Sequence, residues 1–370
     1  MIEADVAIVG GGIHGAAAAL NLARRARRVV LLERDHMGRH ASGASAGGIR
    51  TLLRAAPEIP LALAARDIWH RIEAEVGHNC GYRTVGQVAI AENAEVLAGF
   101  AARAARHDHE ELIDGAELAR LVPALGLAAP GGLVARGDGF ASPFHATMAF
   151  RAAAERAGAV VHEGTPVTNL AAAAGGGWRL ETPAGPVRAR RVVNAAGAWG
   201  DRIAAMAGEE VPLDPFLPMM MVTAPVAQFL TPVVINVARP LSFKQMPNGT
   251  LLIGGGRPGR RDGAGYRVDF GGLKASAATV RDLFPGLAGV PIVRAWAGLE
   301  GRFDDDLPVI GPSARAKGLV HAFGFCGHGL QLAPIVGRIV ADLVIEGRTD
   351  LPIAAFAADR FKAPAMATEG

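Results

Sequence analysis

Two short apolar runs near the start of the chain flank an alanine- and leucine-rich stretch. The runs are Val6–Val9 and Val29–Leu32, and each has the length and apolar character of a buried strand. Between them, Ala16–Ala26 has the apolar content expected of a helix packed on those strands. The pattern predicts a strand–helix–strand unit, the building block of an α/β fold.

The turn before this helix carries glycines in the register G-x-G-x-x-G. Gly10 would allow a tight turn, Gly12 would let backbone approach a pyrophosphate, and Gly15 would let the helix pack closely on the strand. The helix N-terminus adds unpaired N–H groups and the positive end of its dipole. Glu33 follows the second strand, where an acid can accept from a ribose hydroxyl. The succession of strand, glycine turn, helix, strand and acidic residue predicts a dinucleotide site. The alternative is a glycine-rich turn that binds nothing.

The remainder of the chain mixes helical and strand patterns. Residues 38–50 are mostly small and indicate a loop that could lie against a ligand. From 212 to about 294 the chain becomes β-rich, with many prolines and glycines. The expected helices are 60–76, 94–107, 116–121, 143–157 and 332–346, and the expected strands are 87–91, 159–162, 178–182, 187–189, 191–199 (running into a turn), 219–223, 241–245, 251–254 and 319–323.

Dinucleotide-type sequence occurs at the start, in the middle and at the end of the chain, so the chain should cross between two domains several times. We predict an α/β protein with two parts. The first is a Rossmann-like nucleotide-binding domain made of the discontinuous segments 1–82, 140–212 and 296–370. The second is an α+β substrate-binding domain, 83–139 and 213–295, with a large antiparallel or mixed sheet.

Composition and charge narrow the possible partners. Half of the 370 residues are hydrophobic and a fifth are charged, as in an ordinary globular protein. The net charge of +3 is small for this size, so no nucleic-acid partner is predicted. The two cysteines, Cys80 and Cys326, are too few for a disulfide framework or a cysteine-based zinc site. His107-Asp108-His109 lacks a third ligand at a suitable spacing, so no metal is predicted.

The chain also shows no targeting pattern. No basic segment precedes the first apolar run, so a signal peptide is not expected. The apolar stretch Ile335–Ile345 is interrupted by Arg338 and Asp342, and no transmembrane helix is expected. We therefore expect a soluble, cytoplasmic protein.

Seven blocks of sequence, spread over the full length of the chain, form one ordered set. They are Val9–Gly15, Ser42–Ser45, Val193–Trp199, Leu251–Gly255, Trp296–Leu299, Leu307–Pro312 and Gly324–Pro334. Together they resemble the D-amino-acid oxidase-like family of FAD-dependent oxidoreductases. This family includes D-amino-acid dehydrogenases, glycine and sarcosine oxidases, and β subunits of heteromeric sarcosine or hydroxyproline oxidoreductases.

The resemblance implies FAD as the cofactor and oxidation of an amine or amino acid as the reaction. Some relatives attach the flavin through a cysteine, but neither Cys80 nor Cys326 lies in the stretch Trp296–Arg302, so we expect non-covalent FAD. The residues expected around the cofactor are Gly10, Gly12, Ile13, His14, Gly15, Glu33, Arg34, Ser42, Ser45, Ala46, Gly47, Val167, Ala196, Gly197, Trp199, Gly327, His328, Gly329, Leu330 and Gln331.

The turn Gly327–Gln331 also carries a physical argument. It opens the last helix, so it presents backbone N–H groups and the positive end of a helix dipole. Reduced flavin carries negative charge around N1 and the C2 carbonyl, and donors placed there would favour reduction. A plain strand-to-helix connection is the alternative, and His328 could face the substrate or only pack.

The substrate pocket departs from the family pattern. Relatives that oxidise α-amino acids commonly hold the carboxylate with arginine, whose planar guanidinium matches it. Here Glu300 stands in place of the arginine in the stretch that resembles Trp-Ala-Gly-Leu-Arg. Met219–Met221 occupy the substrate-domain strand on which relatives often carry a basic or amide residue. The cations that could replace this arginine are Arg50, Arg302, Lys244 and Arg257. The alternative for each is a surface charge or, for Arg302, an ion pair with Glu300. Glu300 could hold a substrate ammonium, and the methionines are expected in the core more than in the pocket. The candidate catalytic residues are His328, Arg50, Glu300 and Arg302.

We predict an FAD-dependent oxidoreductase acting on the C–N bond of an amino acid or secondary amine of the D-amino acid, N-alkyl amino acid, proline or opine type. The α-hydrogen would move as hydride to flavin N5, leaving an imine that water hydrolyses. Lys244 does not align securely with the lysine that some oxidase relatives place over the flavin, which favours a dehydrogenase. The alternatives are a β subunit that passes electrons to partner subunits or a quinone-type acceptor, and a 2-hydroxy-acid dehydrogenase.

Overall fold

The apolar runs near the start of the chain form the centre of a parallel sheet. The computed structural model describes residues 1–25, 27–262 and 265–361. Strand β1 (Ile2–Val9) lies between β2 (Val29–Leu32) and β12 (Val187–Asn194), and both pairings are parallel. Strands β9 (Val160–His162) and β23 (Leu319–Phe323) extend the sheet in parallel beyond β2 and β12. Three antiparallel strands complete it: β10 (Asn169–Ala172), β11 (Trp178–Glu181) and β22 (Val309–Pro312).

Helices cover this sheet closely because small residues stand at the contacts. Helix α1 (Ile13–Ala23) packs beside α7 (Pro143–Arg156) and α10 (Gly329–Ile345), and α10 in turn contacts α3 (Ile59–Trp69). A Cβ on Gly15 would lie 1.9 Å from the carbonyl oxygen of Gly10, and one on Gly337 would lie 2.7 Å from the backbone of Ala17. On the other face, Ile203 of α8 (Gly200–Met206) packs against β1 and β2.

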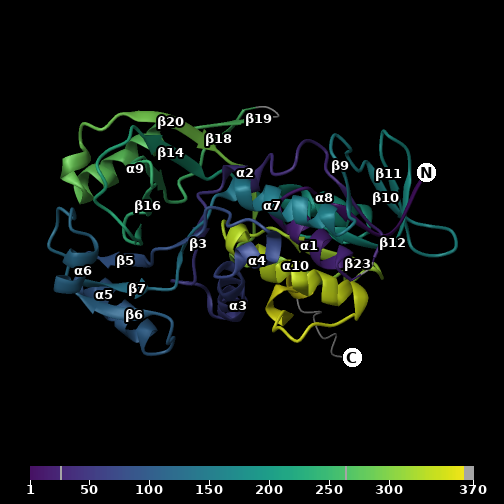
Figure 1. Ribbon diagram of the computed structural model, residues 1–370, viewed down its shortest axis with the longest axis horizontal. Coiled ribbons are helices and arrows are strands. Elements are labelled where there is room, and N and C mark those ends of the chain that lie inside the picture. Colours follow the sequence, from purple (N-terminus) through teal and green to yellow (C-terminus); the bar gives the residue numbers. More distant parts are fainter. Residues whose placement is uncertain (26, 263–264, 362–370) are drawn as a thin grey trace, which may run out of the picture.

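A second sheet lies apart from the first, on the left of Figure 1. All of its strand pairs are antiparallel except β15 with β5. Helices α5 (Ala94–Ala104), α6 (Gly115–Leu121) and α9 (Phe270–Leu283) pack on it. Its strand order is β20 (Ile292–Ala297), β14 (Met219–Thr223), β17 (Leu251–Gly254), β16 (Leu241–Gln245), β15 (Val233–Asn236), β5 (Gln87–Ala91), β7 (Gly131–Ala135) and β6 (Glu111–Asp114).

Short elements link these parts of the molecule. Strands β3, β8 and β4 form a three-stranded sheet, and Figure 1 shows β3 between the two large sheets. The remaining described elements are β3 (Gly48–Ile49), β4 (Arg83–Thr84), β8 (Gly139–Phe140), β13 (Asp214–Phe216), β18 (Arg260–Asp262), β19 (Gly265–Arg267), β21 (Glu300–Arg302), α2 (Ala41–Ala44), α4 (Ile72–Val76) and the 3-10 turns η1 (Ala56–Glu58), η2 (Gly197–Trp199), η3 (Pro285–Leu287), η4 (Ala354–Phe356) and η5 (Ala358–Phe361).

The α/β class is confirmed, and three local expectations are corrected. The helix expected over 60–76 breaks into α3 and α4, because Arg71 leaves helical geometry at φ −122°, ψ 26°. The strands expected at 187–189 and from 191 form the single strand β12. The segment 212–294 is β-rich as expected, but it also contains the unexpected helix α9, whose first turn is capped by Asp269 accepting from the Gly272 N–H at 2.7 Å.

Along the chain, strands of the first large sheet fall in the segments predicted for the nucleotide-binding domain, and strands of the second fall in those predicted for the substrate-binding domain. Strand β20 is the exception, because it crosses the predicted boundary at 295/296. The domain division itself stays a prediction. Across the three described ranges, no helix has both the length and the apolar character that a bilayer span needs.

Candidate active site

The carboxyl ends of the parallel strands β1, β2, β12 and β23 meet at one edge of the first sheet, where ligands bind in open α/β sheets. Three cavities, of about 300, 80 and 490 Å³, follow one another from this edge toward the second sheet. The first and second share Gly12 and Ser42 as walls, and the second and third share Ser45, Glu300 and Gly327. Because they share walls, the three cavities lie next to one another, and we call this row of cavities the channel.

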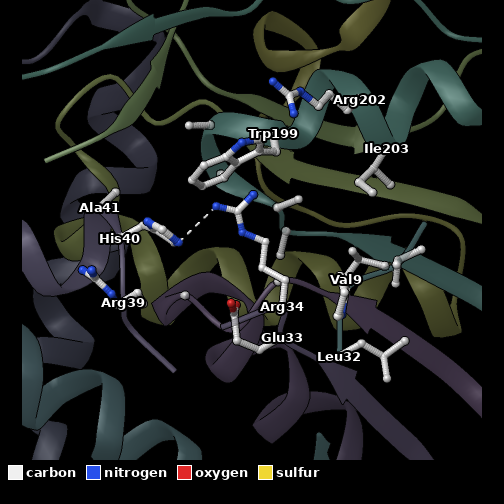
Figure 2. A pocket seen from close by; sticks show the side chains of 18 of the residues that line it. Val9, Leu32, Glu33, Arg34, Arg39, His40, Ala41, Trp199, Arg202 and Ile203 are labelled. Carbon is white, nitrogen blue, oxygen red and sulfur yellow. Dashed lines mark hydrogen bonds between the residues drawn. The ribbon is translucent and has the colours of Figure 1, made fainter. Parts of the chain in front are cut away.

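The first cavity is closed by polar and aromatic side chains (Figure 2). The Arg34 guanidinium lies 3.6 Å from the centre of the Trp199 ring, and one of its nitrogens lies 3.3 Å from Nε2 of His40. Below them, Glu33 Oε2 accepts the Gly11 N–H at 2.6 Å. The predicted cofactor residues on this cavity are Gly10, Gly12, Glu33, Arg34, Ser42, Val167, Ala196, Gly197 and Trp199.

Two helix N-termini approach the channel without a side-chain cap. Helix α1 begins after Gly12 and helix α10 after His328, and neither has an acidic residue in its first turn. In α1, the Ile13 N–H donates to Ser42 Oγ at 3.0 Å. Uncapped N–H groups and aligned dipoles suit an anionic group, such as a pyrophosphate at α1 and the electron-rich edge of a flavin at α10.

The second cavity contains an unpaired buried imidazole. The His14 ring stacks on Phe325 with centroids 3.5 Å apart, and neither ring nitrogen has a hydrogen-bond partner among the described residues. Burial lowers the pKa of His14 to about 3, so its ring is neutral at physiological pH. The predicted residues on this cavity are Gly12, Ile13, His14, Ser42, Ser45, Gly197, Gly327, Gly329 and Leu330.

The third cavity brings together charged groups from both halves of the molecule. Arg50 follows β3, Lys244 lies on β16, Glu300 begins β21, and His328 precedes α10. Lys244 Nζ donates to the Ala46 carbonyl at 2.5 Å. The predicted cofactor residues on this cavity are Ser45, Ala46, Gly327 and His328.

Two of these charges lack a partner. No carboxylate lies within 4 Å of the Arg50 guanidinium in the part of the chain that the structure describes. Burial, aided by the neighbouring Arg54, lowers the pKa of Arg50 to about 9, which still leaves it cationic at neutral pH. Glu300 Oε2 is buried without a well-aligned hydrogen bond among the described residues, and burial, only partly offset by the nearby Gly327 backbone N–H, raises the pKa of this carboxyl to about 7. Partly buried charges of opposite sign without a salt-bridge partner suit a ligand with complementary groups.

The methionine strand divides its side chains between core and cavity. Met221 belongs to the hydrophobic core of the second sheet, and Met219 contacts the start of α9 through Asp269 and Gly272. Met220, between them, lines the third cavity because successive strand residues point to opposite faces.

The structure places four of the predicted site residues away from the channel walls. Arg302 lies in solvent, paired with Asp306 at 2.7 Å and not with Glu300. The Gln331 side chain donates to the Ala62 carbonyl at 2.7 Å, because the first turn of α10 rotates it toward α3. Gly15 and Gly47 instead lie where the chain passes close to another backbone segment, at Gly10 and at Ala141, respectively.

The channel fits FAD: it is elongated, it passes two uncapped helix N-termini, and a Cβ on Gly10 would lie 2.3 Å from the Ala195 carbonyl oxygen. Residues 5–343 match the DAO family, described as FAD dependent oxidoreductase. The chain belongs to this family. As a member, the protein is an FAD-dependent oxidoreductase.

Known relatives of this flavoprotein cover almost all of it. Glycine oxidase from Geobacillus kaustophilus is 31% identical over 96% of this chain and 97% of its own length. Its crystal structure superposes with a TM-score of 0.90 over 98% of this chain and 100% of that chain, at 28% identity. An opine oxidase subunit from Rhizobium meliloti is 27% identical, over 98% of this chain and 99% of its own. Mitochondrial dimethylglycine dehydrogenase from Homo sapiens is 28% identical over 93% of this chain, which spans only 43% of that longer protein.

Sequence reasoning did not find two charged residues behind the third cavity. Arg54 and Glu58 are almost wholly buried, with exposed fractions of 2% and 0%. Their spacing from Arg50, four residues at each step, is the only signal in the sequence. It is weak, because such spacing ordinarily indicates solvated ion pairs on a helix surface.

Proposed function

We propose that this flavoprotein oxidises the C–N bond of an amino acid or secondary amine whose carboxylate is held by Arg50. The observation that carries the proposal is the partly buried Arg50 guanidinium, which lines the third cavity with no carboxylate of the described residues within 4 Å. A guanidinium binds a carboxylate through paired hydrogen bonds, and the pairing is strong where water is excluded. The family and its amine-oxidising relatives support the same reaction class.

The residues along the channel would hold FAD in extended form. Glu33 and Val167 would contact the adenosine, the turn Gly10–Gly12 with Ser42 the pyrophosphate, and the first turn of α10 the flavin. Bound there, the flavin supplies a hydride acceptor at N5. The protein's own part is to orient the substrate between Arg50 and the flavin edge and to exclude water.

Glu300 would determine which amines are accepted. Its carboxyl lines both the second and the third cavity, so it stands where the flavin site joins the substrate site. In its ionised form it would bind a substrate ammonium or a second cationic or amide group. We therefore propose a preference for substrates that carry such a group near the reacting nitrogen.

Anaerobic loss of flavin colour on adding substrate tests this function. The panel contains D-amino acids, N-methyl amino acids, prolines, opines and 2-hydroxy acids. Arg50→Leu should weaken binding of every carboxylate substrate 100-fold or more, and Arg50→Lys should weaken it less. Arg294→Leu, at an exposed position on β20, is the control. Reduction by 2-hydroxy acids alone would refute amine oxidation. Unchanged substrate affinity in Arg50→Leu would refute the role of Arg50.

A second candidate is a subunit that works within a heteromeric complex, and the similarity to an opine oxidase subunit favours it. Partner subunits or a quinone-type acceptor would then receive the electrons, and a dehydrogenase is the form we propose. Size-exclusion chromatography of the separately produced chain, followed by dye-reduction assays, separates the two cases. An active monomer or homodimer would exclude the obligate complex. A cytoplasmic location stays a prediction.

A further inference from the structure

His328 makes a buried contact that the proposed reaction does not by itself require. The residue precedes helix α10, and its ring lines the third cavity. Its Nδ1 lies 3.0 Å from Oε2 of Glu58, a residue at the end of η1 that is 0% exposed. A carboxylate without access to water, placed against one nitrogen of a site histidine, can fix the orientation and tautomer of that ring.

A buried arginine lies beside Glu58. Arg54 Nη1 lies 4.0 Å from Glu58 Oε1. The Arg54 side chain also donates through Nε to the Arg50 carbonyl at 3.0 Å, while the Arg54 carbonyl accepts from Arg103 at 2.7 Å. Arg54 is therefore anchored to the same loop that carries Arg50, and its guanidinium faces the Glu58 carboxylate without a hydrogen bond between them.

The charges around His328 decide its protonation. Burial, together with the nearby Arg54 and Arg50, outweighs Glu58 and lowers the pKa of His328 to about 4. Burial alone would raise the pKa of Glu58, but Arg54 and His328 outweigh it and hold the pKa below its ordinary value. At neutral pH the ring is therefore neutral beside an ionised carboxylate. In such a pair the single ring proton belongs on Nδ1, because a bare Nδ1 would repel the carboxylate.

The other ring nitrogen is left free for the cavity. Nδ1 is buried 3.0 Å from Glu58 Oε2, a close contact whose angle departs from that of a hydrogen bond, and neither atom has another partner among the described residues. Nε2 is not among the buried unpartnered atoms, and it has no hydrogen-bond partner among the described residues. Without a proton, Nε2 is an acceptor. An acceptor there can bind the N–H of a neutral amine and fix rotation about its bond to the α-carbon, which sets the direction of the nitrogen lone pair.

We infer that Glu58 is a positioning residue that keeps His328 in the Nδ1–H tautomer, so that Nε2 accepts a hydrogen bond from the substrate amine. This inference rests on the proposed amine oxidation, and it adds a residue that does not itself touch the substrate. Arg50 would hold one end of the substrate and His328 the other.

Nitrogen-15 NMR of the histidine rings in the FAD-loaded protein tests the tautomer without any substrate. His328→Asn assigns the signal. Wild-type His328 should show a protonated Nδ1 and a bare Nε2 at neutral pH. The double variant Arg54→Met/Glu58→Leu removes both buried charges together, so it avoids leaving one unpaired. It should shift His328 toward the Nε2–H tautomer. A wild-type ring with the proton on Nε2, or an unchanged tautomer in the double variant, would overturn the inference.

Rapid anaerobic mixing with a reducing amine gives the second readout. The double variant should reduce its flavin about 10–100-fold more slowly, the range typical of lost orienting contacts, with little change in substrate affinity. Glu58→Gln, whose amide oxygen can still accept from Nδ1–H, should retain the tautomer and most of the rate. A Glu58→Gln variant as slow as the double variant would refute the orienting role. If no amine reduces wild-type flavin while the tautomer result holds, the proposed function fails and the control of His328 by Glu58 stands.

Discussion

Lys244 and Ala46 join the two halves of the site: Lys244 Nζ donates to the Ala46 carbonyl at 2.5 Å. Ala46 belongs to the small-residue loop along the third cavity, and Lys244 comes from the second sheet. Burial lowers the pKa of Lys244 to about 7. The bond thus ties the loop beside the proposed flavin site to the sheet that closes the substrate cavity.

Replacing this lysine should loosen the loop. Lys244→Met keeps the length and apolar stem of the side chain but removes the donor, at a cost of about 1–2 kcal/mol. We expect FAD to dissociate roughly tenfold more readily, measured by fluorescence of released flavin. Lys274→Met, on helix α9 and outside all three cavities, is the control. Equal FAD affinity in both variants would contradict this role.

The close contact between Gly15 and Gly10 predicts a large effect from one added methyl group. In Gly15→Ala the new Cβ would lie 1.9 Å from the Gly10 carbonyl oxygen, so α1 would have to move away from β1. We expect a loss of about 3 kcal/mol in unfolding free energy and loss of FAD, measured by urea unfolding and flavin content.

Gly99 provides the matched control for this substitution. It lies within helix α5, and a Cβ there meets nothing within 4 Å. Gly99→Ala should therefore stabilise the protein by about 0.5–1 kcal/mol, because alanine is the better helix former. A Gly15→Ala protein as stable as Gly99→Ala would contradict the packing described.

Glu209 predicts a pH-dependent loss of stability. Burial opposes its ionisation, but His321 at 3.0 Å, Ser313 and the Ala314 N–H outweigh burial and hold the pKa of Glu209 at about 2. The folded state therefore releases this proton more readily than the unfolded chain. The resulting stabilisation is complete above the ordinary glutamate pKa of 4.5 and is lost as pH falls toward 2.

Glu209→Gln should accordingly destabilise the protein by about 2 kcal/mol at pH 7, and the difference from wild type should shrink below about pH 4.5. Urea unfolding at several pH values measures it. A difference that stays constant from about pH 7 to about pH 3 would show that the carboxylate charge is not the cause.

The position of Cys326 sharpens the prediction of non-covalent FAD. Its thiol lines the second and third cavities, so it lies close to the proposed flavin site. Burial raises the pKa of this thiol to about 12, which leaves almost no nucleophilic thiolate at neutral pH. Acid precipitation should leave a colourless pellet and a yellow supernatant. A yellow pellet that becomes colourless in Cys326→Ser would show a covalent bond.

The cofactor half of the site could be predicted from sequence because it rests on local constraints. Gly10 has a φ of 113°, Gly12 and Trp199 lie in turns that follow strands, and Ser42 lies in the short helix α2, so their motifs already contain the geometry. Gln331 is the exception. It lies one residue after Leu330 on helix α10, so its side chain points away from the channel and toward α3.

The substrate half could not be predicted in this way, because its residues meet only through tertiary packing. Glu58 lies 270 positions before His328, and nothing local distinguishes it from a solvated acid. The sequence predicts Arg302 in the site because it stands two residues after Glu300. Its side chain instead points outward and forms an exposed ion pair with Asp306.

The most direct test of the central claim is a single anaerobic turnover. FAD-loaded protein is mixed with limiting N-alkyl amino acid, and the carbonyl product from imine hydrolysis is counted against the flavin that loses its colour. We predict one carbonyl compound and one released amine for each flavin reduced, with no turnover in Arg50→Leu at the same substrate concentration. Flavin reduction by 2-hydroxy acids but by no amine in the panel would contradict the claim.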